Sequence, residues 1–388
     1  MRHLHIRNFG PVGEASLELG LVNVIIGMQS SGKSCVLKTA CYCSWVEKRI
    51  ELAQNGDEFA DGDTFMVKMA RYYDMMGYVH GDTYVEYETA RMWFCYDHAT
   101  RRFEMRWKSG RWNYRRAKIS YVPADRNLVA ALQYWKSLEL DGNMLEFLSD
   151  WDKARKFMKR EENFLGLGMS YMYDSSTNTD SIRLRDGEKT LMLRESSSGI
   201  QSLLPMYVHI DYLTKGQYED TNTKISYAQR EEYKSLLDSI YRGMSKKGVP
   251  QEERSVVVAM EDGGYYRFAD EEEMCRFRRI YGNYKRTHHS EIFLEEPEDN
   301  LFPPTQCLFV NWLLDAVGGH KDVLFVATHS PYVLNQFIKS DPEGLAVFFT
   351  FRAEDEADVY SVRQLNEVEV REIYDNGVDM FFNFEQYI

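Results

Sequence analysis

A glycine-bordered segment near the start of the chain has the residue types needed to hold phosphate. Gly27-Met28-Gln29-Ser30-Ser31-Gly32-Lys33-Ser34 fits the pattern Gly-x4-Gly-Lys-Ser, after an apolar run at 21–26 and before a helical pattern at 35–54. Small residues let backbone N–H groups surround phosphate oxygens, while Lys33 would reach the β- and γ-phosphates and Ser34 would ligate Mg²⁺. The segment predicts a P-loop for ATP and Mg²⁺. The alternative is an ordinary Gly/Ser turn between strand and helix.

Two further polar groups follow predicted strands late in the chain. The apolar pattern at 291–294 ends in the adjacent carboxylates Glu295 and Glu296, and the pattern at 322–327 ends in Thr328-His329-Ser330-Pro331. Adjacent carboxylates at a strand end suit a nucleotide site, because one can hold the Mg²⁺ shell while the other polarises the attacking water. A histidine after a strand lies where open α/β sheets place their chemistry.

A serine-rich segment lies between these groups in the sequence. Ser196-Ser197-Ser198-Gly199-Ile200-Gln201 precedes an apolar stretch and reads as a helix start, where hydroxyls and a glycine can bind an anion. Taken singly, each of these three features has an ordinary alternative: a serine run can cap a helix, an acidic cluster can be a solvated face, and a histidine can be structural. Their order behind a P-loop favours the functional interpretation.

Length and composition bound the class of protein. The chain has 388 residues, which allows two or three domains, and its 44% hydrophobic and 28% charged residues are typical of a soluble globular protein. Its 47 Lys and Arg against 60 Asp and Glu give a net charge of −13, so nucleic-acid contact would need a local basic patch. The sequence has no membrane-span pattern and no secretory signal pattern, and its six scattered cysteines are expected to be reduced thiols. These features predict a cytoplasmic protein.

The order of these motifs resembles the ATPase head of the ABC superfamily, and more narrowly its SMC, RecF and OLD-like branch. Residues 6–12, Ile-Arg-Asn-Phe-Gly-Pro-Val, resemble the opening of OLD-type AAA ATPases. Residues 295–303, Glu-Glu-Pro-Glu-Asp-Asn-Leu-Phe-Pro, resemble their Walker B motif and D-loop, and 328–331 is similar to their switch histidine. The resemblance implies an α/β fold with a mixed sheet and flanking helices, interrupted by mostly helical and β-hairpin insertions.

The resemblance also implies roles for matching residues. Glu296 is the implied catalytic base, His329 senses the γ-phosphate, and Glu295 joins Ser34 in the Mg²⁺ shell. Lys33 belongs to both the catalytic and the binding set. The implied nucleotide-binding residues are Asn8, Phe9, Gly27, Gln29, Ser30, Ser31, Gly32, Lys33, Ser34, Cys35, Ser198, Gly199 and Gln201. Among these, Ser198 and Gly199 lie at the signature positions and would contact the ATP of the opposite subunit. Asn8 and Phe9 would lie near the adenine or ribose.

Two positions differ from the family pattern, and one further segment resembles it. Ile200 stands where the transporter signature has a second glycine, and Cys35 follows the P-loop serine where threonine is usual. The segment Pro123-Ala124-Asp125-Arg126 resembles the Pro-Ala-Glu-Arg segment of OLD-like heads. Its acid and its arginine are therefore expected just behind the nucleotide site.

Spacing between the motifs predicts insertions into the head. We place the head at 1–55, 117–130, 190–214 and 288–388, a β-rich insertion at 56–116, a helical insertion at 131–189 and a helical and β interaction module at 215–287. The chain is too short for the coiled-coil arms of SMC proteins. It also ends too soon after the last head strands for the Toprim nuclease domain of OLD proteins.

These features predict an ATP-hydrolysing switch or assembly subunit that works as a homo-oligomer of at least two heads with ATP between them. We expect the ATPase component of an anti-phage defence system that acts with a separate effector. The alternative is a RecF- or SMC-like DNA-repair ATPase, in which the run 101–116, with seven basic and four aromatic residues, would contact DNA. That run could equally be a hairpin whose aromatic face packs on the head. A scaffold that binds ATP only to assemble is a third reading, and the adjacent acids argue against it.

Overall fold

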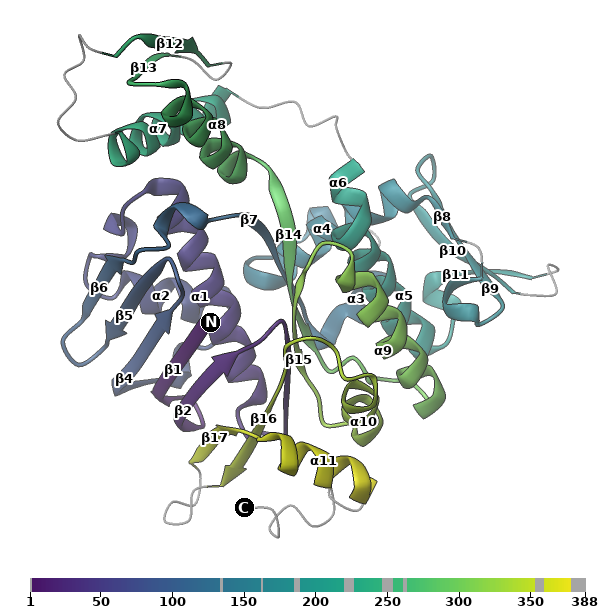
Figure 1. Cartoon of the computed structure of the whole chain (residues 1–388). Coiled ribbons are helices and arrows are strands. Elements are labelled where there is room, and N and C mark those ends of the chain that lie inside the picture. Colours follow the sequence, from purple (N-terminus) through teal and green to yellow (C-terminus); the bar gives the residue numbers. More distant parts are fainter. Residues whose placement is uncertain are drawn as a thin grey trace.

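The computed structural model describes residues 2–132, 135–161, 163–184, 189–219, 227–245, 254–260, 264–352 and 359–377. Within these residues, eleven strands form one mixed sheet through the middle of the molecule (Figure 1). They are β1 (Arg2–Phe9), β2 (Val12–Leu19), β3 (Val22–Gly27), β4 (Val79–Glu88), β5 (Met92–Asp97), β6 (Arg102–Trp107), β7 (Arg116–Val122), β14 (Thr287–Glu295), β15 (Val323–Ala327), β16 (Leu345–Arg352) and β17 (Tyr360–Gln364). Their order across the sheet is β6-β5-β4-β1-β2-β17-β16-β3-β15-β14-β7.

The strands β16, β3, β15, β14 and β7 are parallel, and they place the predicted motifs at one edge. Glu295 lies opposite Ala327, Ala327 lies opposite Ile25, and Gly27 lies opposite Thr350. Because carboxyl ends of parallel strands share one edge of a sheet, the loops that follow β3, β14 and β15 meet there.

The helices lie on both faces of this sheet. They are α1 (Lys33–Ala53), α2 (Thr64–Tyr72), α3 (Leu128–Ala131), α4 (Gly142–Met158), α5 (Ser198–Asp211), α6 (Gln217–Glu219), α7 (Tyr227–Met244), α8 (Glu271–Lys285), α9 (Pro303–Gly318), α10 (Pro331–Ser340) and α11 (Glu367–Asn376). Alternate residues of the central strands enter two different cores: Ile25 and Phe325 pack with α1, while Val24 and Val326 pack with α5, α9 and α10. Burial on both faces explains the continuous apolar runs of these strands. The predicted fold class, a mixed α/β sheet with flanking helices, is confirmed.

The other half of the sheet is antiparallel. The strands β4, β5 and β6 continue it outward from β1, with His3 opposite Glu88. Residues that we assigned to a β-rich insertion thus share a sheet and a hydrophobic core with the N-terminal strands. This continuity fixes β1 and the turn that follows it, which lies beside the P-loop.

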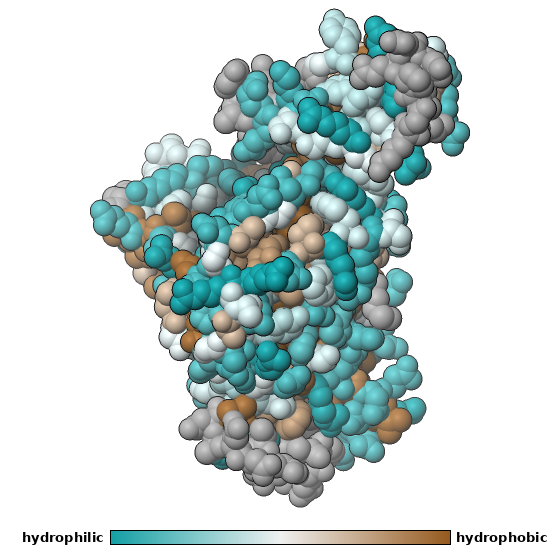
Figure 2. Space-filling view, turned by 90° about the vertical axis from the view of Figure 1, so that its left-hand side faces the viewer, coloured by the Kyte–Doolittle hydropathy of each residue, from teal (hydrophilic) through white to brown (hydrophobic). Residues whose placement is uncertain are grey.

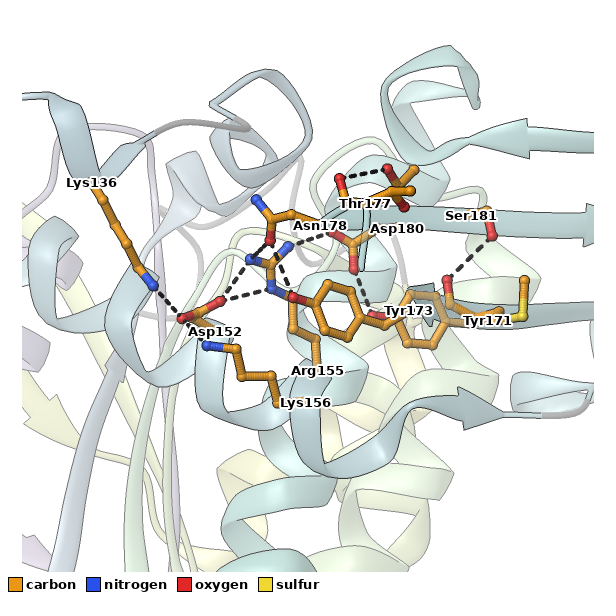
Figure 3. Close-up of polar contacts among 12 residues, drawn as sticks. Lys136, Asp152, Arg155, Lys156, Tyr171, Tyr173, Thr177, Asn178, Asp180 and Ser181 are labelled. Atoms are coloured by element: carbon orange, nitrogen blue, oxygen red, sulfur yellow. Dashed lines mark hydrogen bonds and ion pairs between the residues drawn. The ribbon is translucent and has the colours of Figure 1, made fainter. Parts of the chain in front are cut away.

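A four-stranded sheet of β8 (Arg160–Glu161), β9 (Met169–Asp174), β10 (Thr179–Leu184) and β11 (Thr190–Met192) is joined to α4 by a polar network (Figure 3). Arg155 lies at its centre and donates to Asp152 at 2.6 Å and to Asp180 at 2.8 Å. Asp152 also accepts from Lys136 and Lys156. These cations hold the pKa of Asp152 well below its usual range, although burial opposes them. The basic residues here are therefore paired within the fold.

A third hydrophobic core lies in the segment from α7 to α8, with β12 (Val256–Ala259) and β13 (Tyr265–Phe268). This unit sits above α1 in Figure 1. Tyr284 of α8 donates to Glu51 of α1 at 2.7 Å, and a Cβ on Gly243 would lie 2.9 Å from the Trp112 ring. The unit is thus packed against the C-terminal end of the P-loop helix.

Figure 2 shows one face of the molecule, on which hydrophilic side chains predominate and hydrophobic ones form small separate areas. No helix among the described residues is long and apolar enough to cross a membrane.

Candidate functional site

The P-loop connects β3 to α1 through backbone conformations that require glycine. Gly27 has φ +151° and Gly32 has φ +92°. A Cβ on Gly27 would lie 1.8 Å from Thr350 Oγ1, and one on Gly32 would lie 2.7 Å from Val12 Cγ2. The loop is thus held between β16 and the β1–β2 turn, and neither glycine can be replaced without displacing a neighbour. Met28, Gln29 and Ser30, between them, are exposed.

The start of α1 is open to an anion. Gly32 is the N-cap residue, and it has no side chain to accept from the first N–H groups of the helix. These groups and the helix dipole favour negative charge at this point. Ser31, by contrast, is buried, and its hydroxyl hydrogen-bonds to Thr350 and to the Met28 carbonyl. The buried serine therefore shapes the loop, whereas the exposed backbone is free to wrap phosphate.

Lys33 is folded back on its own loop. Its Nζ donates to the Gly27 carbonyl at 3.0 Å and to the Met28 carbonyl at 2.6 Å, and the residue is 7% exposed. Burial lowers the pKa of Lys33, while the nearby Glu296 and Glu298 oppose that shift. Phosphate oxygens could take over the two carbonyl contacts without moving the lysine far.

Glu295 is the last residue of β14, and it faces the first turns of α1. Its Oε1 lies 4.0 Å from Lys38 Nζ. Lys38 is four residues after Ser34 and therefore shares its face of the helix. Ser34 is partly exposed, so its hydroxyl is accessible. A hydroxyl and one carboxylate fit Mg²⁺, which is usually held in proteins by one or two carboxylates together with substrate phosphates.

Glu296 and His329 lie together at the edge of the sheet. His329 Nδ1 is 3.7 Å from Glu296 Oε1 and 3.7 Å from Glu298 Oε1. Burial raises the pKa of Glu296, with Glu298 and Glu295 adding to the shift and with His329 and Lys33 opposing it. The structure therefore brings Lys33, Glu296 and His329 from three distant segments into one electrostatic cluster.

Glu298 belongs to this cluster, although the sequence analysis assigns no role to it. It is 7% exposed, and its Oε1 accepts from the His329 backbone N–H at 2.8 Å. Its other oxygen is buried without a hydrogen-bond partner. Its sequence signals are its place as the third acid of the run 295–298 and the resemblance of residues 295–303 to a Walker B motif and D-loop. It fixes the position of the histidine backbone.

Arg126 connects the acidic strand end to α5. The side chain is fully buried, and burial lowers its pKa to about 10. Its guanidinium donates to the carbonyls of Pro123, Ser202, Glu295 and Glu296, the last two at 2.8 and 2.7 Å. The arginine therefore lies directly behind the two acids and holds their backbone.

The serine-rich segment caps α5 and leaves Ser198 exposed. Ser197 Oγ accepts from the Ile200 N–H, and Gln201 donates to the carbonyls of Arg194 and Ser196. A Cβ on Gly199 would lie 2.8 Å from the Asn300 carbonyl oxygen, so the helix start packs tightly on the loop after β14. Among the described residues no hydrogen bond joins this segment to the P-loop of its own chain.

The N-terminal positions lie beside the P-loop, in different environments. Asn8 donates to Asp82 at 2.5 Å. Phe9 is fully buried, and its carbonyl accepts from Cys35 Sγ at 3.4 Å. Burial raises the pKa of this thiol, so Cys35 is a packed neutral group in the structure. The ring of Phe9 contacts Tyr78, whose own side chain is exposed.

The basic run 101–116 is largely engaged within the fold. Arg106 lies over the Trp93 ring, and Arg111 lies over the rings of Trp107 and Trp112. Lys108 pairs with Glu88. Phe103 and Tyr114 are buried in two different cores. Packing thus accounts for most of this pattern, and contact with DNA stays a prediction.

No protein-family model and no curated protein matches the chain. Solved structures are similar over nearly its whole length. The SMC head domain from Thermotoga maritima has 11% sequence identity and a TM-score of 0.43, with 94% of this chain and 100% of that chain covered. An ATP-binding cassette of an ABC transporter in its ADP conformation has 10% identity and a TM-score of 0.35, with 99% of each chain covered. The recombination mediator protein RecF has 12% identity and a TM-score of 0.31, with 94% of this chain and 97% of that chain covered. The function is inferred below from the geometry of the site itself.

Proposed function

We propose that the protein binds and hydrolyses ATP and uses the nucleotide as a conformational switch. One observation carries the proposal: the P-loop lysine, an adjacent pair of carboxylates and a histidine converge at the carboxyl ends of the parallel strands of the sheet. Converging groups of this kind are what phosphoryl transfer requires, because its catalysis consists mainly of positioning and charge stabilisation.

The proposed mechanism assigns each group a task. Lys33 leaves its two carbonyls and counters negative charge on the β- and γ-phosphates. Ser34 and Glu295 would hold Mg²⁺, which supplies charge neutralisation across the phosphates. Glu296, whose pKa is raised, orients the attacking water and accepts its proton, and His329 lies beside it to detect the γ-phosphate.

We further propose that a second copy of the chain completes the site. Ser198 begins α5, is exposed, and has no bond to its own P-loop. Two heads arranged head to tail would place this serine and the adjoining helix N-terminus on the ATP of the partner. Binding of ATP would then drive assembly, and hydrolysis would release it.

Two substitutions test the chemistry. Lys33→Ala should abolish binding of a fluorescent ATP analogue, whereas Glu296→Gln should retain binding and lower phosphate release by about a hundredfold. Glu343→Gln, an exposed carboxylate away from the site, is the matched control and should hydrolyse normally. Wild-type turnover in Glu296→Gln would overturn the assignment of the base.

For the cellular role we propose the ATPase subunit of a cytoplasmic anti-phage defence system with a separate effector. The resemblance to OLD-like heads supports this role, as does the unit from α7 to α8 with its own core, which offers a surface for a partner. Co-purification with the products of neighbouring genes, with ATP present and absent, is the direct test. Capture of a nuclease or toxin would support the proposal.

A DNA-repair role is the second candidate, because Arg101 and Arg102 at the start of the basic run remain more than two-thirds exposed. This role requires that added DNA increases the ATPase rate of the wild type. The double variant Arg101→Glu and Arg102→Glu should no longer show that increase. An ATPase rate that is indifferent to DNA would dismiss it.

A further inference from the structure

A second concave site lies toward the far end of α1 from the P-loop. It is a cleft of about 740 Å³, bounded by α1, α2, β7, the start of α4 and one residue of α7. A neighbouring hollow of about 230 Å³ shares Arg49, Leu52, Arg116 and Glu232 with it. This volume falls in the range of sites for small molecules and cofactors.

The cleft is rich in positive charge. Its lining includes Lys48, Arg49, Lys68, Arg71, Arg116 and Lys118. Three of these are neutralised. Glu58 pairs with Arg49 and Lys68, and Asp150 pairs with Lys118 at 2.5 Å. In the part of the chain that the structure describes, Lys48, Arg71 and Arg116 have no carboxylate within ion-pair distance. The unpaired acids of the lining, Asp141 and Glu232, are both exposed.

Lys48 is the most constrained of the unpaired cations. Its Nζ donates to the Ala117 carbonyl at 2.8 Å. Burial, together with Arg116 and Lys118, lowers its pKa to about 7, and Glu146, which also lines the cleft, and Glu291 only partly oppose this. The charged form of a partly buried lysine beside two other cations is unfavourable unless an anion binds there. The same residues would then become favourable ligands.

Aromatic surface lies beside these cations. Trp45 lines the cleft and is stacked on Tyr42, with ring centroids 5.6 Å apart and planes at 24°. Cys41, Trp45, Lys48 and Leu52 follow the spacing that places side chains on one face of a helix. That face of α1 therefore offers a flat ring and a cation side by side, which is the pairing used to hold bases and phosphates.

We propose that this cleft binds a small ligand of the nucleotide class, with phosphate held by Lys48, Arg71 and Arg116 and with a planar ring placed against Trp45. The ligand would contact the same helix that begins at the P-loop. Lys33 and Lys48 are separated by about 22 Å along α1, so the bound ligand would act on the nucleotide site through a rigid element. This last step rests on the proposed ATPase function, whereas the binding itself does not.

The test is calorimetric titration of AMP into the full chain carrying Lys33→Ala, in which the P-loop is disabled and the cleft is intact. We expect saturable binding that is weakened about tenfold or more by adding either Lys48→Met or Arg71→Gln. Arg71 is exposed, so its substitution leaves the core intact and guards against misfolding of the other variant. Lys339→Met, on α10, is the control and should leave affinity unchanged.

A second readout separates ligand contact from a structural role. An anion beside Lys48 raises its pKa, so at pH 7 the chain should take up as much as about half a proton more per AMP bound than Lys48→Met does. Titrations in two buffers of different ionisation enthalpy measure this difference. Absence of AMP binding, equal affinity for inorganic phosphate, or equal weakening by the control variant would overturn the proposal. Binding of AMP by the Lys33→Ala chain, together with failure of the wild-type chain to hydrolyse ATP, would refute the proposed function alone.

Discussion

Arg126 provides the sharpest test of how the nucleotide site is held together. Its guanidinium is the shared donor for backbone carbonyls of the β7 end, the β14 end and α5. Arg126→Met keeps apolar bulk but removes every donor. Breaking a buried, charge-assisted network commonly costs several kcal/mol, because each acceptor then loses a partner that water cannot replace. We expect the free energy of unfolding to fall by about 3–5 kcal/mol.

The same substitution should lower activity beyond its effect on stability. Two of the four acceptors are the carbonyls of Glu295 and Glu296, so losing the arginine frees the backbone that places both acids. We expect kcat to fall at least about tenfold while KM for ATP changes little, since the P-loop is not touched. Arg126→Lys should have a kcat between those of the wild type and Arg126→Met, because an ammonium group keeps the charge but cannot reproduce the planar set of donors.

Urea unfolding followed by fluorescence gives the stability change, and steady-state phosphate release at low urea gives the kinetics. Arg102→Met is the matched control, because its side chain is 73% exposed and its ion-pair partner within the described residues is Glu104, which is itself exposed. That variant should stay within about 0.5 kcal/mol of the wild type. If Arg126→Met unfolds at the wild-type urea concentration and hydrolyses ATP at the wild-type rate, the buried network does not position the site.

Three other results are expected. Gly199→Ala should destabilise the chain by about 1–3 kcal/mol, because the added Cβ meets the backbone oxygen of Asn300, while Gly282→Ala, in α8 with open space around it, should not; thermal unfolding compares them. Burial raises the pKa of Glu51 to about 8, so the folded state holds a proton that the unfolded state releases from about pH 4.5 upward. The free energy of unfolding that this group contributes therefore falls as pH rises from about 4.5 to 8. In urea titrations, Glu51→Gln should become more stable relative to the wild type between pH 5 and 8. A difference in unfolding free energy that does not change with pH would contradict the shift. Finally, Ser198→Arg and Lys33→Ala should each be inactive alone and regain part of the ATPase rate when mixed, because a mixed pair contains one intact composite site; no rescue at any ratio would argue against the shared site.

The sequence predicted those parts of the site that local chemistry determines. A P-loop is recognisable because strand, glycine-bordered turn and helix are contiguous, and each needs its residue types for its own backbone conformation. Glu295 and His329 could be placed because Glu295 ends one buried strand and His329 lies two residues after another, and parallel strands bring such ends together. The fold class followed from the resemblance of the motif order to ABC-type heads. The central strands are continuous apolar runs, as expected where both faces of a sheet are covered.

Contacts that depend on how distant elements pack could not be derived in this way. Arg126 was expected near the site, but its acceptors lie as far along the chain as Glu296. The unpaired cations of the α1 cleft come from three separate elements, because Lys48 lies on α1, Arg71 on α2 and Arg116 on β7, so no single stretch of sequence shows the cluster. The strands β4 to β6 join the main sheet because β1 offers them an open edge, and a pattern of alternating residues does not state which edge a strand will choose.

The packing of α5 explains why the exposed serine and the acids should act as one unit. Gly199 lies against the Asn300 carbonyl, Ser202 Oγ accepts from the Asn300 side chain at 3.1 Å, and the Ser202 carbonyl accepts from Arg126. The start of α5 is therefore fixed to the loop after β14 within one chain, while Ser198 at that helix start is exposed. In the proposed dimer, a shift of Glu296 on hydrolysis would then move Ser198 against the partner copy. Loosening this contact, as in Gly199→Ala, should uncouple hydrolysis from assembly before it abolishes ATP binding.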